Sequence, residues 1–272
     1  MDGFRLMGVV NVTPDSFSDG GEFLDAGRAV RHGRRLLEEG ADIVDVGGES
    51  TRPGAAPVGV EEELRRVMPV VEGLAGAEIS IDTSKAEVAR RAIAAGATMV
   101  NDVTALRSDP ELTEVVAQAG TEVCLMHMLG DPRTMQADPR YGDVVSDVKA
   151  FLEQRMAFAV SGGILEERIL LDPGIGFGKT VDHNLELLRR LDEIVALGRP
   201  VVIGTSRKSF LGRITGAQVG ERVPGTIATN VLALERGATV FRVHDVAPAR
   251  DALAIALATV TGRWSPATTT TS

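Results

Sequence analysis

Short runs of apolar residues, rich in Val, Ile and Leu, recur along the chain at intervals of about 20 to 45 residues. Each run is only a few residues long, which favours a β-strand over a helix. Because the runs are nearly continuous rather than alternating, we expect both faces of each strand to be covered. The expected strands span residues 4–12, 42–47, 78–83, 98–103, 122–127, 169–174, 201–206 and 239–245.

The segments between these runs carry apolar residues at helical spacing. The expected helices lie within residues 26–41, 60–74, 85–97, 109–120, 143–160, 183–198, 226–238 and 248–260. Glycines just after several of these segments fit helix C-caps that turn the chain back into the next strand. They are Gly40, Gly96, Gly120, Gly198 and Gly237.

Strand and helix alternate eight times in 272 residues, which predicts an α/β protein built as a closed (β/α)8 barrel, or TIM barrel. An open, doubly wound sheet is the alternative. No linker or change of composition divides the chain, so we expect a single barrel domain over residues 1–265. Residues 266–272, which end in TTTTS, are expected to form a disordered tail.

Composition narrows the possible partners. The chain has 29 Lys and Arg against 38 Asp and Glu, a formal net charge of -9, and such a field repels nucleic acid and anionic membrane surfaces. An anionic ligand therefore needs a local basic pocket. The single cysteine, Cys124, excludes an intrachain disulfide and a CxxC zinc site, and we expect it to be buried and inert. The N-terminus fits neither a signal peptide nor a spanning helix, so we expect a soluble cytoplasmic protein.

Polar side chains stand at the ends of the expected strands, where a barrel of this class carries its chemistry. They are Asn11, the segment GGESTRPG, Asp82, Asn101 and Asp102, His127, Asp172, then Ser206, Arg207 and Lys208, and finally Arg242 and His244. A single polar strand end often only caps the next helix. Eight of them at one mouth of a barrel indicate a binding site.

The residue types at this mouth predict two kinds of ligand group. Acceptors are expected on one part of the rim, from Asp82, Asn101 and Asp172. Cations and donors are expected on another part, from Arg52, Lys208, Arg242 and His244. A ligand with a donor-rich heterocycle at one end and an anion at the other would match this arrangement.

The segment DPGIGFGKT (172–180) contains GKT but is not a phosphate-binding P-loop, because Pro173 stands where that motif needs glycine. We expect a wall loop of the pocket instead. Its glycines allow close backbone approach, and Phe177 is free to contact a ligand. A plain tight turn is the alternative.

The histidines divide into two kinds. His32 and His183 lie within or at the start of expected helices, where surface or capping roles are expected. His244 follows Arg242 by two residues on the same strand face, so we expect it to donate to an anion. His127 is intermediate, with orientation of its loop as one role, and neighbouring Met126 is expected to line the pocket.

The stretch NVTPDSFSDGG (11–21) follows the first strand and is rich in hydroxyls and turn formers. A loop of this kind, containing Pro14, Gly20 and Gly21, is expected to fold over a bound anion as a lid anchored at Asn11. A plain surface connection is the alternative.

Taken in order, these motifs resemble the dihydropteroate synthase family over nearly the whole chain. They are NVTPDSFSDGG, DVGGESTRPGA, SIDTSK, VNDV, LMHM, LDPGIGFGK, TSRKSFLG and FRVHDV. The family condenses 6-hydroxymethyl-7,8-dihydropterin diphosphate with 4-aminobenzoate, which yields 7,8-dihydropteroate and diphosphate for folate synthesis. The resemblance therefore implies a Mg2+-dependent transferase on a TIM barrel, commonly a homodimer.

The resemblance also assigns expected roles to residues. Positions matching the pterin pocket are Asp82, Asn101, Asp172 and Lys208, with Met126 and Gly204 as wall contacts. Positions matching the diphosphate site are Asn11, which is also the metal contact, Arg242, which also lies against the pterin ring, and His244. Positions matching the aminobenzoate site are Thr51, Arg52, Pro53, Phe177 and Ser206. Catalytic roles are expected for Lys208, Arg242, His244 and Asn11.

The residues fit this chemistry on physical grounds. The Asp172 carboxylate can accept adjacent N–H groups of a 2-amino-4-oxopyrimidine ring. The main catalytic task is cleavage of a carbon–oxygen bond, with Mg2+, Arg242 and His244 stabilising the charge that grows on the leaving diphosphate. The arylamine is neutral at pH 7 and needs no strong base, so we expect a dissociative displacement.

Two other functions remain open from the sequence. One is a pterin-binding barrel that transfers a methyl group from methyltetrahydrofolate, against which the SRK and FRVH motifs argue. The other is a catalytically silent pterin-binding or scaffold protein.

Overall fold

Eight parallel strands form the wall of a barrel in the computed structural model, which describes residues 3–13, 22–51, 54–131 and 134–264. The strands are β1 (Arg5–Asn11), β2 (Ile43–Gly47), β3 (Ile79–Asp82), β4 (Met99–Asp102), β5 (Glu122–Met126), β6 (Ile169–Asp172), β7 (Val202–Ile203) and β8 (Val240–Val243). Each lies within a segment expected to be a strand. The expected segments run longer because their last residues turn into the loops that build the mouth.

The strand order is β6-β5-β4-β3-β2-β1-β8-β7, so neighbours in sequence are neighbours in space and β1 pairs with β8. The remaining seam lies between β6 and β7. There the Leu171–Val201 bridge and the hydrogen bond from Leu171 N to Pro200 O, at 3.0 Å, join the two edges. The closed (β/α)8 barrel is therefore confirmed over the open sheet.

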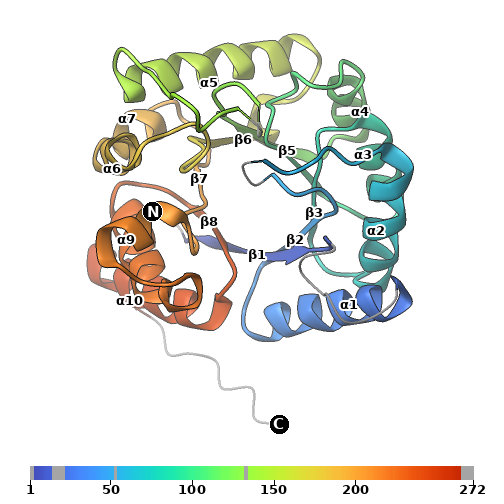
Figure 1. The fold of residues 1–272 in the computed structure, drawn as a ribbon, viewed down its shortest axis with the longest axis horizontal. Coiled ribbons are helices and arrows are strands. Elements are labelled where there is room, and N and C mark those ends of the chain that lie inside the picture. The colour runs from blue at the N-terminus through green and yellow to red at the C-terminus, as the bar shows by residue number, and fades with distance from the viewer. Residues whose placement is uncertain (1–2, 14–21, 52–53, 132–133, 265–272) are drawn as a thin grey trace.

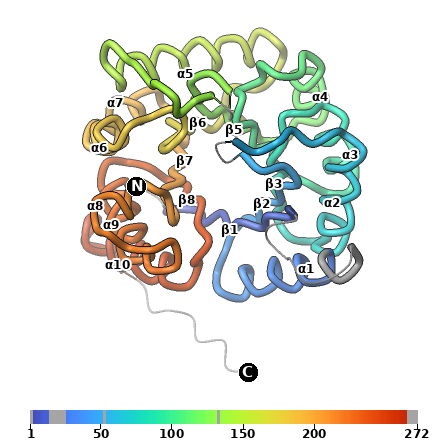
Figure 2. The backbone as a smooth tube through the Cα atoms, in the orientation of Figure 1, coloured from blue at the N-terminus to red at the C-terminus, as the bar shows by residue number. Residues whose placement is uncertain are grey.

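Helices surround this wall (Figure 1), and the chain passes from strand to helix around the ring (Figure 2). They are α1 (Glu22–Glu38), α2 (Val60–Gly73), α3 (Ala86–Ala94), α4 (Leu112–Ala119), α5 (Val144–Ser161), α6 (Val181–Arg189), α7 (Leu191–Val195), α8 (Ser209–Thr215), α9 (Val223–Glu235) and α10 (Val246–Thr261). The short 3-10 turns are η2 (Glu166–Arg168) and η3 (Val219–Glu221). Within the described ranges, no helix is long and apolar enough to cross a membrane.

The helices differ from expectation in two places. The segment 183–198, expected as one helix, is divided at Arg190 into α6 and α7. The helix α8, between β7 and α9, was not expected. The glycines expected to end helices all have positive φ, between 64° and 112°, as that role requires. The proposed tail, residues 266–272, lies outside the described residues.

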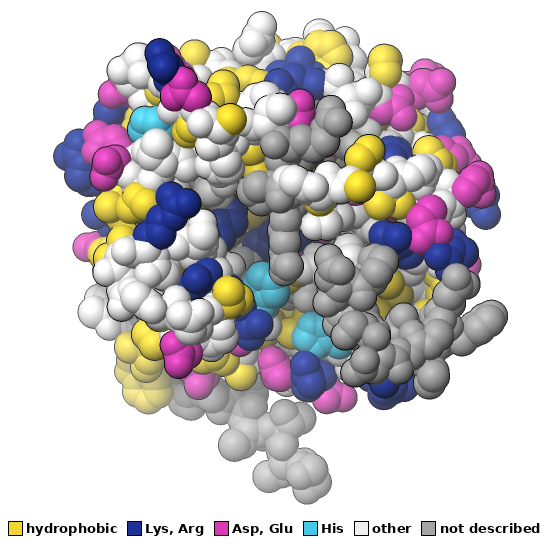
Figure 3. Space-filling model, viewed as in Figure 1, with side chains coloured by type: hydrophobic (Ala, Val, Ile, Leu, Met, Phe, Trp, Pro, Cys, Tyr) yellow, Lys and Arg dark blue, Asp and Glu magenta, His cyan; other side chains and the backbone are white. Residues whose placement is uncertain are grey.

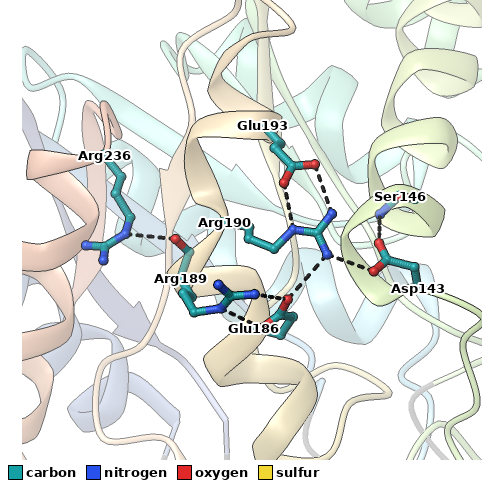
Figure 4. A network of polar contacts seen from close by, with 7 residues as sticks. All are labelled: Asp143, Ser146, Glu186, Arg189, Arg190, Glu193 and Arg236. Atoms are coloured by element: carbon teal, nitrogen blue, oxygen red, sulfur yellow. Dashed lines mark hydrogen bonds and ion pairs between the residues drawn. The ribbon is translucent and has the colours of Figure 1, made fainter.

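Arg190 links the two parts of the divided helix to α5 (Figure 4). Its Nε donates to Glu193 Oε1 at 2.6 Å, and its Nη1 donates to Asp143 Oδ2 at 2.7 Å. Asp143 in turn caps α5 by accepting the Ser146 N–H at 2.8 Å. The Arg190 guanidinium holds the pKa of Asp143 below its usual range. These groups are exposed to solvent, so the network orients α5, α6 and α7 more than it stabilises them.

The barrel interior contains its own apolar layer, separate from the large core between strands and helices. It is formed by Met7, Ile43, Met99, Cys124, Leu170, Val202 and Val240. Cys124 is fully buried there, as expected. Because side chains alternate along a strand, the residue two places after each member also points inward, nearer the mouth. This second tier is largely polar, and it forms the base of the candidate site.

Candidate active site

Arg242 is the centre of a buried charge network in the barrel mouth. Its Nε donates to Asp45 Oδ2 at 2.6 Å, and its Nη2 donates to Asp82 Oδ2 at 2.8 Å. One guanidinium therefore joins β8 to β2 and β3. Burial disfavours its charge, but the two carboxylates outweigh burial and raise the pKa of Arg242. Its Nη1 has no protein partner among the residues that the structure describes.

Asp45 belongs to this network, although reasoning from strand ends missed it. Its side chain is fully buried, and Oδ2 also accepts the Asn101 amide Nδ2 at 3.2 Å. Its other oxygen, Oδ1, has no hydrogen-bond partner within the described ranges. Asp45 lies two residues after Ile43 of the apolar layer, and that spacing is the signal that could have found it.

Asp82 is the second carboxylate held by Arg242. Burial raises its pKa to about 7, although Arg242 opposes the shift, and the neighbouring Asp45 adds to it. One guanidinium cannot fully compensate the negative charges of two buried carboxylates. The pKa of Asp82 is therefore raised rather than lowered. Asp82 is therefore close to its titration point near neutral pH.

Asp172 and Lys208 form the other half of the mouth. Asp172 accepts the Gly174 N–H on Oδ1 at 2.6 Å, and burial raises its pKa. Lys208 donates to the Ile175 carbonyl, and its Nζ lies 4.5 Å from the centre of the Phe177 ring. Burial lowers the pKa of Lys208 to about 8, although nearby Asp172 opposes the shift.

The expected separation of acceptors and cations into different parts of the rim is wrong for Arg242 and Lys208. Arg242 is paired with Asp82, and Lys208 interacts electrostatically with Asp172. The physical reason is burial, because a charge withdrawn from water needs a counter-charge close by. Arg242 and Asp172 do share one mouth, since each influences the titration of the other.

The segment from Asp172 to Thr180 is a loop that joins β6 to α6, and its role as a pocket wall stays a prediction. Gly174 has φ of 67°, and a Cβ there would lie 1.8 Å from the His127 carbonyl oxygen, so only glycine fits. Lys179, a residue of this loop to which sequence reasoning gave no role, has a buried side chain. It contacts His127 Nδ1 at 2.8 Å and donates to the Phe177 carbonyl at 3.0 Å.

His127 therefore orients this loop. Burial and the nearby Lys179 lower its pKa to about 2, so the ring is neutral at physiological pH and can accept from Lys179. Burial also lowers the pKa of Lys179 itself. Asp102 has a comparable local role, since it accepts the backbone N–H groups of Thr104 and Leu106.

An apolar wall lies beside the polar groups. Met126 packs with Val103, Met128 and Met135, and the half-buried Phe177 packs against this group. Met126 thus belongs to an apolar group at this mouth, and its role in lining a pocket stays a prediction. A Cβ at Gly204 would lie 3.9 Å from both Arg242 Cβ and Lys208 Nζ, so Gly204 lies between those two side chains.

Another part of the mouth carries His244, Ser206 and Asn11. The Ser206 hydroxyl lies 2.9 Å from His244 Nδ1 and accepts the His244 backbone N–H at 3.1 Å. Asn11 ends β1 in register with Gly47 and is half-buried. In the space-filling view, basic and histidine side chains gather in and around the central hollow (Figure 3).

A pocket of about 360 Å3 adjoins His244, between α1 and the start of α10. His32 lines it beside Arg35, whose Nη2 lies 2.8 Å from His32 Nδ1, so His32 is half-buried at a pocket rather than on open surface. The capping role expected for His183 is confirmed, because it forms a capping box with Thr180 at the start of α6.

The remaining expected site residues belong to the loops after β2 and β1. Thr51 is described and half-buried in the loop after β2. Arg52 and Pro53 lie outside the described residues, as does residue range 14–21 of the expected lid. Their roles remain predictions, as do the ligand contacts of every residue named above.

Comparison with known proteins identifies a family and several similar proteins. Residues 7–244 match the family described as "Pterin binding enzyme". The chain is 47% identical to the dihydropteroate synthase of Escherichia coli strain K12, over 95% of this chain and 93% of that protein. It superimposes with a TM-score of 0.89 on a Xanthomonas albilineans dihydropteroate synthase bound to 4-aminobenzoic acid, at 51% identity over 95% of this chain and 93% of that one.

A second structure of the Xanthomonas albilineans enzyme contains 7,8-dihydropteroate. Its TM-score to this chain is 0.86, at 48% identity over 95% of this chain and 94% of that one. Sequence identity and fold therefore agree over most of this chain.

Proposed function

This chain belongs to the pterin-binding enzyme family, among the dihydropteroate synthases, and on that premise we propose how its barrel mouth joins a pterin to 4-aminobenzoate. The reaction condenses 6-hydroxymethyl-7,8-dihydropterin diphosphate with 4-aminobenzoate, and it releases 7,8-dihydropteroate and diphosphate in folate biosynthesis. The observation that carries the proposal is the row of buried acceptors around Arg242. Together with Asp172, these groups would present acceptors to a flat, donor-rich ring.

Three acceptors are available to the pterin edge. Asp172 uses Oδ1 for the Gly174 N–H, so Oδ2 is left for ring N–H groups. Asn101 directs its amide nitrogen to Asp45, which leaves its amide oxygen as an acceptor. Asp82, held by Arg242, completes the edge. These groups are already in place before substrate binds, so little reorganisation is needed.

Two further groups complete the pterin pocket. Lys208 is placed beside Asp172, where its ammonium can donate to the ring carbonyl. Met126 and Gly204 would supply wall contacts, Met126 from the apolar group and Gly204 from between Arg242 and Lys208. Arg242, with its plane fixed by two carboxylates, would lie against the ring.

The leaving diphosphate is assigned to Asn11, His244 and Arg242. Ser206 fixes the His244 ring, and the Arg242 Nη1 is left to donate. The described residues contain no cluster of three His, Cys, Asp or Glu side chains suited to a metal. Mg2+ needs only one or two protein oxygens when a substrate supplies phosphate oxygens, so the Asn11 amide oxygen fits such a metal. Bound there, Mg2+ would offset the charge that develops on the diphosphate.

The displacement proceeds by loss of diphosphate from the CH2 carbon, with the bonding electron pair leaving on oxygen. Electron donation from the pterin ring stabilises the resulting cation. The neutral arylamine nitrogen then bonds to that carbon and releases a proton. Contacts to 4-aminobenzoate are assigned to Thr51, Arg52, Pro53, Phe177 and Ser206. The Lys208 ammonium, which lies 4.5 Å from the centre of the Phe177 ring, would then stand between the two substrates.

The alternatives are less well supported. Methyl transfer from methyltetrahydrofolate would need the same pterin edge but no diphosphate site. The related enzymes bound to 4-aminobenzoic acid and to 7,8-dihydropteroate favour the condensation. A catalytically silent pterin-binding protein is distinguished by the first experiment below.

A homodimer in the cytoplasm is also proposed. The helix α10 is apolar around most of its circumference, yet Ile255 and Val260 are exposed, at 70% and 51%. Leu232 of α9, which packs against α10, is also exposed, at 46%. Apolar helices are normally covered, so a second copy of this chain is the partner that we propose for this surface.

Mixing the wild-type protein with both substrates and Mg2+ should release diphosphate and form 7,8-dihydropteroate in equal amounts, measured by coupled phosphate assay and chromatography. Lys208→Ala should lower kcat/KM by roughly 100-fold or more, because it removes a donor from the reacting ring. Absence of 7,8-dihydropteroate with the wild type, or near-normal turnover by the variant, would contradict the assignment.

Asn11→Ala should weaken diphosphate binding only when Mg2+ is present, by roughly 10- to 100-fold, because a metal contact is lost. Isothermal titration with diphosphate, with and without Mg2+, measures the difference. Equal weakening in both conditions would assign Asn11 a role that is independent of the metal.

The pH profile of kcat/KM for the pterin substrate should have a maximum between about 7 and about 8. Below pH 7, Asp82 takes up a proton and loses its acceptor character, because its pKa is raised to about 7. Above pH 8, Lys208 loses its charge, because its pKa is lowered to about 8. Asp82→Asn should remove the acid limb, and Lys208→Arg should move the basic limb upward. An acid limb that persists in Asp82→Asn, together with an unmoved basic limb in Lys208→Arg, would contradict these assignments.

Sedimentation velocity should give the mass of two chains for the wild type. Ile255→Lys should shift it to that of one chain, because a charge is placed in the proposed contact. Leu165→Lys, a change at another exposed apolar position, is the matched control and should leave the dimer intact. A monomeric wild type would contradict the proposal.

A further inference from the structure

A single carboxylate closes the base of the loop between β2 and α2. Glu49 Oε1 accepts the backbone N–H of Val58 at 3.0 Å, which joins the two ends of the loop. Glu49 Oε2 accepts from the Lys85 ammonium at 2.5 Å. Lys85 lies just beyond β3, so Glu49 also attaches the loop to a neighbouring strand end.

A second carboxylate, that of Glu63, also binds Lys85. Its Nζ also donates to Glu63 Oε2 in the first turn of α2. The Glu63 side chain is fully buried, and its other oxygen has no partner within the described ranges. The two carboxylates outweigh the burial of Lys85 and raise its pKa, so it remains charged. A buried carboxylate without this cation would be strongly destabilising, which fixes Lys85 in place.

The loop also approaches α2 closely at its first residue. A Cβ at Gly48 would lie 2.8 Å from Val67 Cγ1 and 3.1 Å from Glu63 Cγ, so a glycine is needed there. Arg66 adds a bond from its Nη1 to the Gly48 carbonyl at 2.8 Å. Specific contacts therefore attach the base of the loop to α2 and to the segment after β3.

The two segments that Lys85 joins carry groups assigned to different substrates. Asp82, three residues before Lys85, belongs to the pterin edge. Thr51, two residues after Glu49, belongs to the aminobenzoate loop. Their relative placement depends on the contact that Lys85 makes.

We propose that Lys85 is a positioning residue for the arylamine: by tying Glu49 to Glu63, it sets where the loop that follows β2 stands relative to the pterin edge. The proposal rests on the proposed function, because it concerns the second substrate of that reaction. It assigns Lys85 no contact with either substrate. Loss of the Lys85 side chain should therefore change KM for one substrate more than KM for the other.

Steady-state kinetics on Lys85→Met, with each substrate varied in turn, tests this inference. We expect KM for 4-aminobenzoate to rise roughly tenfold, because small misplacement of a binding loop has effects of this size or larger. KM for the pterin diphosphate should stay within about twofold of wild type. Lys85→Arg, which keeps the charge, should recover most of the loss.

The matched control is Arg90→Met on α3. Arg90 is an exposed cation of the same segment that pairs with Glu87 and Glu111, and neither partner belongs to the described part of the loop. Its loss should leave both KM values unchanged. Should Lys85→Met fail to fold, Glu49→Gln provides the same test, because an amide cannot accept from both Val58 and Lys85. It should show the same selective rise.

Two results would overturn the positioning role. One is an equal change of both KM values in Lys85→Met or Glu49→Gln, which a general loss of structure would produce. The other is an unchanged KM for 4-aminobenzoate. Absence of condensation by the wild-type protein is a different outcome, since it would overturn the proposed function itself.

Discussion

The mouth of this barrel depends on one half-buried guanidinium that bridges two buried carboxylates. Arg242 bonds to Asp45 and Asp82 and so connects strands that are far apart in the chain. Withdrawing these charges from water is unfavourable, and close pairing is what makes it tolerable. The pairing also fixes the orientation of Asp82 and, through Asp45, of Asn101. A substrate ring thus meets acceptors whose positions the protein has already set.

Stability and chemistry are divided between tiers of the same strands. The apolar layer of the interior fills the barrel, and the tier two residues further on presents carboxylates, an amide and a guanidinium. A change in the upper tier therefore alters binding while the layer below continues to support the wall. This division is the physical basis on which a barrel of this class can carry a polar, reactive mouth.

Two lysines stabilise the loops around that mouth in similar ways. Lys179, after β6, bonds to His127 and to the Phe177 carbonyl beneath the wall loop. Lys85, after β3, bonds to Glu49 and Glu63 beneath the loop that follows β2. In both cases a lysine side chain holds a loop near its base. The loop is then free to present other residues to the ligand.

The sequence by itself determined the eight strands, the class of barrel, the glycines that end helices and most of the residues at the mouth, because these depend on local periodicity and on strand ends. Only the tertiary structure decided which charges are paired. Arg242 meets Asp82 across 160 residues of sequence and Asp45 across 197, and no local pattern encodes such partners. The same holds for Lys179 and Lys85, whose roles come from side chains that the closed barrel brings to them. The division at Arg190 was missed because its ion pairs depend on the tertiary structure, and α8 was missed because seven residues are too few to show helical periodicity.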